Sequence, residues 1–387
     1  MTELPGGFVA YVANVGVKDT TDDFVVLAAD RPVPAAGVFT RSRFAGPSVT
    51  MSRAHLADGR ARAIVVVSKN ANVANGPLGD EHAADVVEAV ADRLGCAPSD
   101  VLIASTGVIG RPYPIERITA GIERMPADLP DTSIDGAARG MMTTDTVPKI
   151  ASAAVAGSAA TVVGMAKGVG MIEPNMATMI AVLVTDAAVG AAELDDRFRR
   201  VVDDTFNCVS IDTDTSTSDT AVVLAGGAAG PVDGDALERA LHDVARSLTQ
   251  QIAADGEGAE TLIEVTVVGA RDRAQAKRVA KAIVNSPLVK TAVHGADPNW
   301  GRVAMAIGKC DGPDDTDIDQ DAVVIRFGDR EVYPKRVDEA ELAELSAYLG
   351  GDEVQIGVTL GTGAAACTVW GCDLTAGYIR INADYTT

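Results

Sequence analysis

Short apolar runs alternate with amphipathic segments along most of the chain. Continuous or alternating apolar positions predict strands at residues 7–17, 24–29, 63–68, 101–105, 161–165, 178–185, 220–224, 262–268, 322–327, 354–360 and 364–370. Helical spacing predicts helices at residues 80–94, 196–205, 235–254, 274–284 and 339–348, with Asp80 and Asp235 placed to cap two of them. Strands that alternate with helices are typical of a layered α/β protein.

Length and charge narrow the class of protein. With 387 residues the chain is long enough for two lobes, and 47% of its residues are hydrophobic. Its 33 basic and 54 acidic residues give a net charge of −21. Nucleic-acid binding needs a basic surface, and an anionic membrane would repel this chain. We therefore expect a soluble, cytoplasmic enzyme acting on small molecules, with neither nucleic acid nor membrane as a partner.

Metal chemistry finds little support in the sequence. The chain has four histidines and five cysteines, and they form neither an HExxH nor a CxxC pattern. No metal site is therefore predicted.

Residues 164–186 form the most unusual segment of the sequence. A glycine-rich turn carrying Lys167 leads to Pro174, and Thr178 then opens an apolar strand. If Thr178 attacked the preceding carbonyl and the resulting ester were hydrolysed, its hydroxyl would become the nucleophile of a new N-terminus, with its own α-amine as base. The alternative is an ordinary β-branched strand residue, and the spacing alone favours this alternative.

Other polar clusters occur near predicted strand ends. Thr106 and Gly107 follow the strand at 101–105, where a turn can offer a hydroxyl and a backbone N–H to an oxyanion. Hydroxyl and carboxylate side chains crowd residues 142–146 and 212–219, and DGEG at 255–258 places a carboxylate in a turn. An ordinary solvated turn is the alternative for each. The segments NSPLVKT and DPNWGR are too particular for a generic surface, but their spacing indicates no role.

Taken in chain order, these motifs resemble one known family. The resemblance is carried by IASTGVIG, MTTDT, KGVGMIEPNMATM, DTDTSTSDT, DGEG, NSPLVKTA, DPNWGR and the C-terminal Tyr385-Thr386-Thr387. They are similar to the ornithine acetyltransferases, also called glutamate N-acetyltransferases, over essentially the whole chain.

The resemblance implies a fold and a processing event. The expected fold is α/β (α+β layered), an αββα-type sandwich shared with DmpA-like enzymes, with N-terminal-nucleophile chemistry but a different connectivity. Members of the family cleave themselves before the Thr of Met-Ala-Thr-Met, here between Ala177 and Thr178. This predicts an α chain of residues 1–177 and a β chain of residues 178–387 that form one interlocked fold, assembled as an α2β2 heterotetramer.

The resemblance also implies site residues. Thr178 matches the nucleophile, and Thr106 with Gly107 matches the pair that stabilises the oxyanion. The implied substrate-binding residues are Thr178, Thr144 (with Thr143 as the alternative), Lys167, Glu257, Asn382 and Thr387. Lys167 also tunes the Thr178 amine, and Glu257 holds an amino group of ornithine. Asn382 and Thr387 close over the substrate.

The implied reaction is a ping-pong acyl transfer in arginine biosynthesis. N-acetylornithine acetylates Thr178 and ornithine leaves, after which glutamate carries the acetyl group away. No cofactor or metal is implied, and acetyl-CoA is left open as a second acetyl donor. The alternatives are a hydrolase of the same superfamily, such as a deacylase or aminopeptidase, and a catalytically silent binding protein.

One acidic segment departs from the usual family pattern. Thr213 stands where glycine is usual, and Ser218 where asparagine is usual. Relatives from specialised-metabolism clusters, including those that make clavulanic acid, carry such changes. The pathway and the preferred acceptor are therefore left open.

Overall fold

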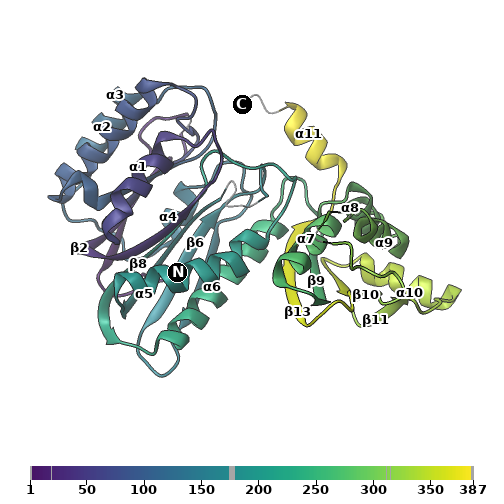
Figure 1. Ribbon diagram of the computed structural model, residues 1–387. Coiled ribbons are helices and arrows are strands. Elements are labelled where there is room, and N and C mark those ends of the chain that lie inside the picture. Colours follow the sequence, from purple (N-terminus) through teal and green to yellow (C-terminus); the bar gives the residue numbers. More distant parts are fainter. Residues whose placement is uncertain (1, 19, 174–178, 311, 314, 385–387) are drawn as a thin grey trace. The chain divides into compact units, whose positions relative to one another are not determined.

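The computed structural model describes residues 2–18, 20–173, 179–310, 312–313 and 315–384 (Figure 1). The chain forms two compact units. Unit 1 contains the chain up to Asn207 together with Asp214–Leu248, and unit 2 contains Cys208–Thr213 and the chain from Thr249 onward. These limits differ from the predicted α and β chains. The predicted cleavage site at Ala177 and Thr178 lies outside the described residues, so the two-chain division stays a prediction.

Unit 1 is built on an eight-stranded sheet. Its strands are β1 Phe8–Ala13, β2 Phe24–Phe39, β3 Arg60–Val67, β4 Val101–Ser105, β5 Lys149–Ala154, β6 Thr161–Lys167, β7 Ile180–Ala188 and β8 Thr220–Pro231. The order is β4-β3-β2-β8-β7-β6-β5, and β1 also pairs with β2. Strands β3 and β4 run parallel, as do β7 and β8, while the other pairs are antiparallel.

Strand β2 joins the two halves of this sheet and is longer than the predicted strand at 24–29. Its first half pairs with β3 and its second half with β8. The register shifts between Ala28 and Val33, where Pro32 and Pro34 cannot donate to a hydrogen-bond ladder. The sequence pattern ended at this irregularity, whereas the strand bends there and continues to Phe39.

The halves of the sheet face each other across a buried core. Successive β2 residues alternate between two clusters: Val25 and Leu27 lie between the halves with Val182 of β7, whereas Phe24 and Val26 face outward. The outward face of the first half is covered by α2, whose Ala83, Val86, Val87, Val90 and Ala91 belong to the same outer cluster. On the second half, a Cβ at Gly164 would lie 2.8 Å from Val244 Cγ1 of α6. This confirms the αββα sandwich for unit 1.

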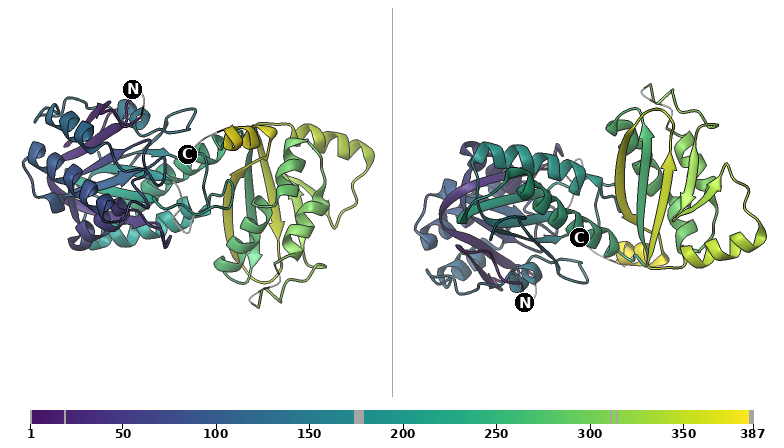
Figure 2. Two further views of the ribbon diagram at one scale, coloured as in Figure 1. Left: turned by 90° about the horizontal axis from the view of Figure 1, so that it is seen from above. Right: turned by 90° about the horizontal axis from the view of Figure 1, so that it is seen from below.

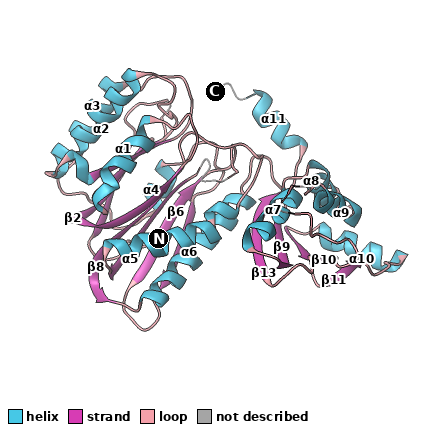
Figure 3. Ribbon diagram, viewed as in Figure 1, coloured by secondary structure: helices cyan, strands magenta, loops and turns pink. Residues whose placement is uncertain are grey.

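The helices of this part of the chain are α1 Pro47–His55, α2 Pro77–Leu94, α3 Ile115–Glu123, α4 Asp135–Gly140, α5 Ala191–Asp204 and α6 Gly234–Ala254, with short 3-10 turns at Leu56–Asp58, Pro98–Asp100 and Phe206–Cys208 (Figure 3). Both predicted caps are wrong. Helix α2 begins before Asp80, with Pro77 in its first turn. At α6 the amide of Ala236 donates to Asp233 Oδ1 (2.8 Å), while Asp235 binds Arg197 instead (3.0 Å).

Unit 2 has its own five-stranded sheet, covered by helices (Figure 2). Its strands are β9 Leu262–Ala270, β10 Val324–Phe327, β11 Arg330–Tyr333, β12 Glu353–Thr359 and β13 Ala365–Cys372, in the order β11-β10-β12-β9-β13. Only the β12–β9 pair in this sheet is parallel. The helices are α7 Arg273–Val284, α8 Pro287–His294, α9 Trp300–Gly308, α10 Glu339–Leu349 and α11 Ala376–Asp384, and α7 packs against β9 and β13.

The segments NSPLVKT and DPNWGR contain the starts of two helices of unit 2, α8 and α9. Ser286 accepts the Val289 amide at the start of α8. Arg302 of α9 donates to Leu288 O (2.7 Å) and to Thr291 Oγ1 (3.2 Å) of α8. Both segments therefore have a structural role in holding α8 against α9. Among the described helices, none is both long and apolar enough to cross a membrane.

Candidate active site

A buried turn follows β4 and contains two of the predicted site residues. Thr106 is buried, and Gly107 has a φ of +129°. A Cβ at Gly107 would lie 2.2 Å from the carbonyl carbon of Lys69, so this close approach of two backbones requires glycine. The amides of Thr106 and Val108 donate to Val67 O (3.1 Å) and Lys69 O (3.4 Å), whereas the Gly107 N–H has no acceptor within the described chain. One amide of the turn thus has no hydrogen-bond partner in the described chain, as the predicted oxyanion role requires.

Lys167, at the end of β6, points to the same turn. Its side chain is buried, and Nζ donates to Thr106 Oγ1 at 3.2 Å. In the pairing of β6 with β7, Lys167 lies opposite Ile180. The structure therefore brings Lys167 and Thr106 together from opposite halves of the sandwich, at the strand end where β7 begins.

A buried carboxylate holds this arrangement. Asp145 Oδ1 accepts Lys149 Nζ (2.7 Å) and the Gly168 amide (2.7 Å), and Oδ2 lies 4.0 Å from Lys167 Nζ. Burial by itself would raise the pKa of Asp145, but the two lysines and the Gly168 amide outweigh burial and lower the pKa to about 2. Asp145 is therefore ionised at neutral pH and balances two buried ammonium groups.

Asp145 also organises the loop of residues 142–146. Its Oδ2 accepts the Thr143 amide at 3.1 Å. Thr143 and Thr144 are both half-buried and adjoin this carboxylate in sequence, so the loop holds both candidate substrate-binding threonines. Sequence reasoning missed Asp145 as a site residue, although an acid inside a hydroxyl-rich motif was a signal for it.

Asp219 flanks the start of β7 on the side opposite Lys167. Strands β7 and β8 are parallel, with Ile180 opposite Thr220. The Met179 amide donates to Asp219 Oδ1 (3.1 Å), and the Thr220 amide donates to Met179 O (3.0 Å). Met179 directly follows Thr178 in the sequence. Asp219 is a second buried acid beside the candidate site, and in the sequence it stood out only as part of the polar run at residues 212–219.

Three of the residues predicted for cleavage, catalysis or substrate binding are not described by the structure. Ala177, Thr178 and Thr387 lie outside the described residues. Thr106, Gly107, Lys167 and the loop with Thr144 all belong to unit 1. Lys167 pairs with Ile180 of β7, the strand that follows Thr178 in the sequence.

The other two predicted substrate-binding residues meet in unit 2. Asn382 of α11 donates from Nδ2 to Glu257 Oε2 at 2.9 Å. The loop that carries Glu257 packs closely on the start of α11, because a Cβ at Gly258 would lie 2.3 Å from Tyr378 N. Thr375 Oγ1 also donates to Gly258 O (2.6 Å). Two residues that are 125 positions apart in sequence thus form one polar pair.

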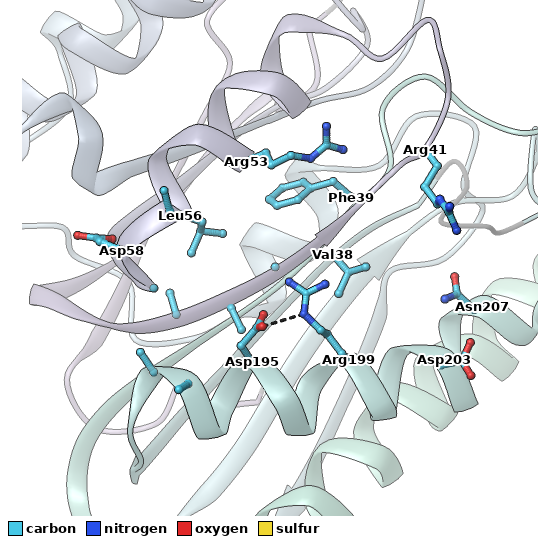
Figure 4. Close-up of a pocket in the computed structure, with 17 residues that line it drawn as sticks. Val38, Phe39, Arg41, Arg53, Leu56, Asp58, Asp195, Arg199, Asp203 and Asn207 are labelled. Carbon is cyan, nitrogen blue, oxygen red and sulfur yellow. Dashed lines mark hydrogen bonds and ion pairs between the residues drawn. The ribbon is translucent and has the colours of Figure 1, made fainter.

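Two further features involve none of the predicted residues. A cavity of about 960 Å³ lies beside the second half of β2 in unit 1. Arg199 lines this cavity and forms an ion pair with Asp195 at 2.7 Å (Figure 4). Among the described residues of unit 2, Glu260, His294 and Asp373 place potential metal ligands within 4.8 Å of one another. His294 Nδ1 and Asp373 Oδ2 are 3.1 Å apart, which is an ordinary hydrogen-bond distance.

Sequence comparison decides which family this arrangement belongs to. The model of the ArgJ family matches residues 9–387. The chain belongs to the ArgJ family. Within this family, it is 58% identical to the glutamate N-acetyltransferase Oat2 of Streptomyces clavuligerus, over 100% of this chain and 98% of that protein. It is 57% identical to the arginine biosynthesis bifunctional protein ArgJ 2 of a Nostoc species, over 100% of this chain and 99% of that protein.

Two solved structures are also similar to this ArgJ family member. The ArgJ protein of Bacillus halodurans is 40% identical, with a TM-score of 0.48, over 52% of this chain and 96% of that one. An ornithine acetyltransferase of Mycobacterium tuberculosis, crystallised with ornithine, is 31% identical, with a TM-score of 0.38, over 44% of this chain and 92% of that one. The family match confirms the resemblance found in the sequence motifs.

Proposed function

We propose that this ArgJ family member is a glutamate N-acetyltransferase that moves the acetyl group of N-acetylornithine to glutamate. Relatives at 57–58% identity over the full chain bear glutamate N-acetyltransferase and ArgJ names. The observation that carries the proposal is the turn after β4: a Gly107 amide with no acceptor in the described chain lies in the same turn as Thr106, which is bound to Lys167. Such a turn suits the developing oxyanion of an acyl transfer.

The first half-reaction acetylates the enzyme. Thr178 Oγ attacks the acetyl carbonyl of N-acetylornithine, and the α-amine of Thr178 takes the hydroxyl proton. Thr106 and Gly107 stabilise the oxyanion of the tetrahedral intermediate. As the C–N bond breaks, the same amine returns the proton to the leaving nitrogen. Ornithine departs, and an acetyl ester stays on Thr178.

The second half-reaction regenerates the enzyme. The amino group of glutamate attacks the ester carbonyl, the α-amine of Thr178 accepts the displaced proton, and Thr178 Oγ leaves and is reprotonated. N-acetylglutamate is released. The reaction needs no cofactor or metal, and acetyl-CoA, which could acylate the same hydroxyl, is the second donor to assay.

Lys167 serves this chemistry through its charge. A buried ammonium close to the site favours the neutral form of a nearby amine, which the proposed base requires. It also offsets the net charge of −21 where substrate carboxylates have to bind. Thr144, Glu257, Asn382 and Thr387 are assigned to substrate binding in the same proposal, with Glu257 facing an ornithine amino group.

Self-cleavage between Ala177 and Thr178 makes the nucleophile. The proposal includes α and β chains of residues 1–177 and 178–387, their α2β2 assembly and a cytoplasmic location. One relative in Streptomyces clavuligerus is named glutamate N-acetyltransferase Oat2, and another in the same organism is named for arginine biosynthesis.

The deciding experiment measures products with and without glutamate. N-acetylornithine with glutamate should give ornithine and N-acetylglutamate in equal amounts, and omission of glutamate should stop turnover after one acetylation. Ornithine release that ignores glutamate would instead indicate a hydrolase. Thr178→Ala is the matched control, and it should abolish both self-cleavage and transfer.

A further inference from the structure

Asp219 is a buried acid that the proposed reaction does not use. It is 0% exposed, and its Oδ1 accepts the Met179 amide at 3.1 Å. Its other oxygen, Oδ2, is also buried and has no hydrogen-bond partner among the described residues. An ionised carboxylate left in this state would pay a large desolvation cost.

The surroundings of Asp219 do not supply a counter-charge. Thr40 and Ser216 are its polar side-chain neighbours, and their hydroxyl groups act to lower its pKa. They are neutral: Thr40 Oγ1 donates to Ser216 O (2.7 Å), and Ser216 Oγ accepts the Ser218 amide (3.0 Å) while keeping its own proton. Lys167 is the cation that acts on Asp219, but it is bound to Thr106 and lies near Asp145. Burial therefore dominates and raises the pKa of Asp219 well above its ordinary value.

We propose that Asp219 is a positioning residue that works as a neutral carboxylic acid, accepting the Met179 N–H at Oδ1 while its second oxygen, Oδ2, is protonated and buried. This inference rests on the proposed function. Met179 is held on both sides, because its amide binds Asp219 Oδ1 and its carbonyl accepts the Thr220 amide (3.0 Å). Met179 is bonded to the predicted nucleophile in the sequence, so its two contacts give Asp219 a route to the reaction through one covalent link.

The neutral form suits an amine base better than a carboxylate does. A carboxylate near the α-amine would stabilise the ammonium form and raise the pKa of the amine. The amine would then be protonated at neutral pH and unable to accept the hydroxyl proton. A carboxylic acid keeps the same shape and the acceptor for the Met179 amide without this penalty.

Asp219→Asn and Asp219→Ala separate these roles. Asparagine keeps an acceptor for Met179 and a donor in place of Oδ2–H, so we expect cleavage and kcat within roughly threefold of wild type. Alanine removes the acceptor for the Met179 amide, and kcat should fall roughly tenfold or more with KM nearly unchanged, because misplacement of a reacting group mainly slows chemistry. Equal kcat in the two variants, or a lower kcat for asparagine than for alanine, would overturn the proposal.

The pH profile tests the charge of Asp219 directly. The acidic limb of kcat/KM should be the same in wild type and Asp219→Asn, because neither has a charge at this position. If wild type carried a carboxylate, the limb of the asparagine variant would shift to lower pH by roughly one unit or more, and the proposal would be wrong. Asp23→Asn is the structural control. Asp23 is a buried acid that accepts the Val15 and Val17 amides (2.7 and 2.8 Å), and its substitution should lower stability without changing kcat.

Unfolding at several pH values gives a readout that does not depend on activity. A carboxyl whose pKa is raised in the fold contributes stability at low pH and loses it as the pH rises through the folded pKa. The stability of Asp219→Asn relative to wild type should therefore increase from about pH 4 upward. A difference that does not vary with pH would contradict a neutral Asp219. A wild-type protein that is inactive and uncleaved would overturn both the proposed function and the positioning role of Asp219. The unfolding series would still decide the protonation state of Asp219.

Discussion

The residue that holds the site together is a buried acid surrounded by two lysines. Asp145 and Lys149 are both almost fully buried and 2.7 Å apart, and Lys167 lies 4.0 Å away. Removing one member of a buried charge group costs more than the group contributes as a whole, because the remaining charges lose their compensation. Asp145 therefore matters to stability as well as to the orientation of Lys167.

Asp145→Asn should destabilise the protein by about 3–5 kcal/mol, since it leaves two buried ammonium groups without their carboxylate. Urea unfolding measures the loss. The double variant Asp145→Asn with Lys149→Met is the matched control, and it should recover part of the loss because one unpaired charge is gone. If Asp145→Asn lowers the free energy of unfolding by less than about 1 kcal/mol, as is typical of an exposed ion pair, the buried charge group of Asp145, Lys149 and Lys167 does not stabilise the fold as described.

The lowered pKa of Asp145 leads to a related prediction about stability at low pH. Its folded pKa is lowered to about 2. The stability that its ionised form provides is present above the ordinary carboxyl pKa of about 4 and is lost as the pH falls towards 2. Wild-type unfolding free energy should fall over this window more steeply than that of Asp145→Asn.

Thr213 shows why a departure from the family pattern matters. Its φ is +70°, a left-handed conformation that β-branched residues rarely adopt, and its side chain is exposed. Glycine, usual at this position in the resembled family, carries no such strain. Thr213→Gly should therefore raise stability by roughly 1 kcal/mol despite the greater freedom of glycine in the unfolded chain.

Thr215→Gly provides the comparison. Thr215 is also exposed but does not have a positive φ, so glycine there should lower stability by about 0.5–1 kcal/mol. Thermal unfolding of both variants decides the matter. A loss of stability in Thr213→Gly equal to that in Thr215→Gly would show that Thr213 is unstrained.

At the scale of elements, the turn after β4 is the most sensitive part of the site. Gly107→Ala would place a Cβ 2.2 Å from the Lys69 carbonyl carbon, so the turn has to move and its amide with it. We expect kcat to fall by roughly 10²–10³, as when one oxyanion donor is lost.

Gly110→Ala is the matched control for this turn. Gly110 also has a positive φ (+78°), but a Cβ there meets nothing within 4 Å. Both variants introduce backbone strain at a positive φ. Circular dichroism checks that both are folded, and the melting temperature measures the stability that each loses. Only Gly107→Ala should lose activity, and equal kcat values in the two variants would contradict the assigned role of the turn.

The sequence pattern located the central elements better than the short ones. Strand β4 was predicted at its observed bounds, and β6 and β7 were found because buried central strands are nearly continuous apolar segments. Strand β9 was found because its buried positions alternate with less buried ones. Strand β5 was missed, since its alternating side chains are mostly small, and α8 and α9 were missed because they are only 8 and 9 residues long.

The site was only partly predictable for a related reason. Thr106, Gly107 and Lys167 were named through family motifs, and their proximity is a property of the sandwich that sequence spacing cannot express. Asp145 and Asp219 depend on burial and on partners far along the chain, such as Lys167 and Met179. Their significance follows from tertiary packing, so an acidic residue in a polar motif was the most that the sequence could show.

At the scale of the whole molecule, the predicted cut falls inside unit 1 rather than between the units. Strand β6 precedes the cut and β7 follows it, and these two strands pair from Val162–Thr185 to Lys167–Ile180. Cleavage would therefore leave α and β chains that share one sheet, and strand pairing explains how they would remain associated. The two compact units and the two proposed chains describe different divisions of the same molecule.

The most direct test of the account is the mass spectrum of the denatured wild-type protein after brief exposure to N-acetylornithine without glutamate. The account predicts two chains, residues 1–177 and 178–387, with one acetyl group on the second chain at Thr178, and loss of that acetyl group when glutamate is added. A single intact chain of 39.8 kDa, or cleaved chains that never carry an acetyl group, would contradict it.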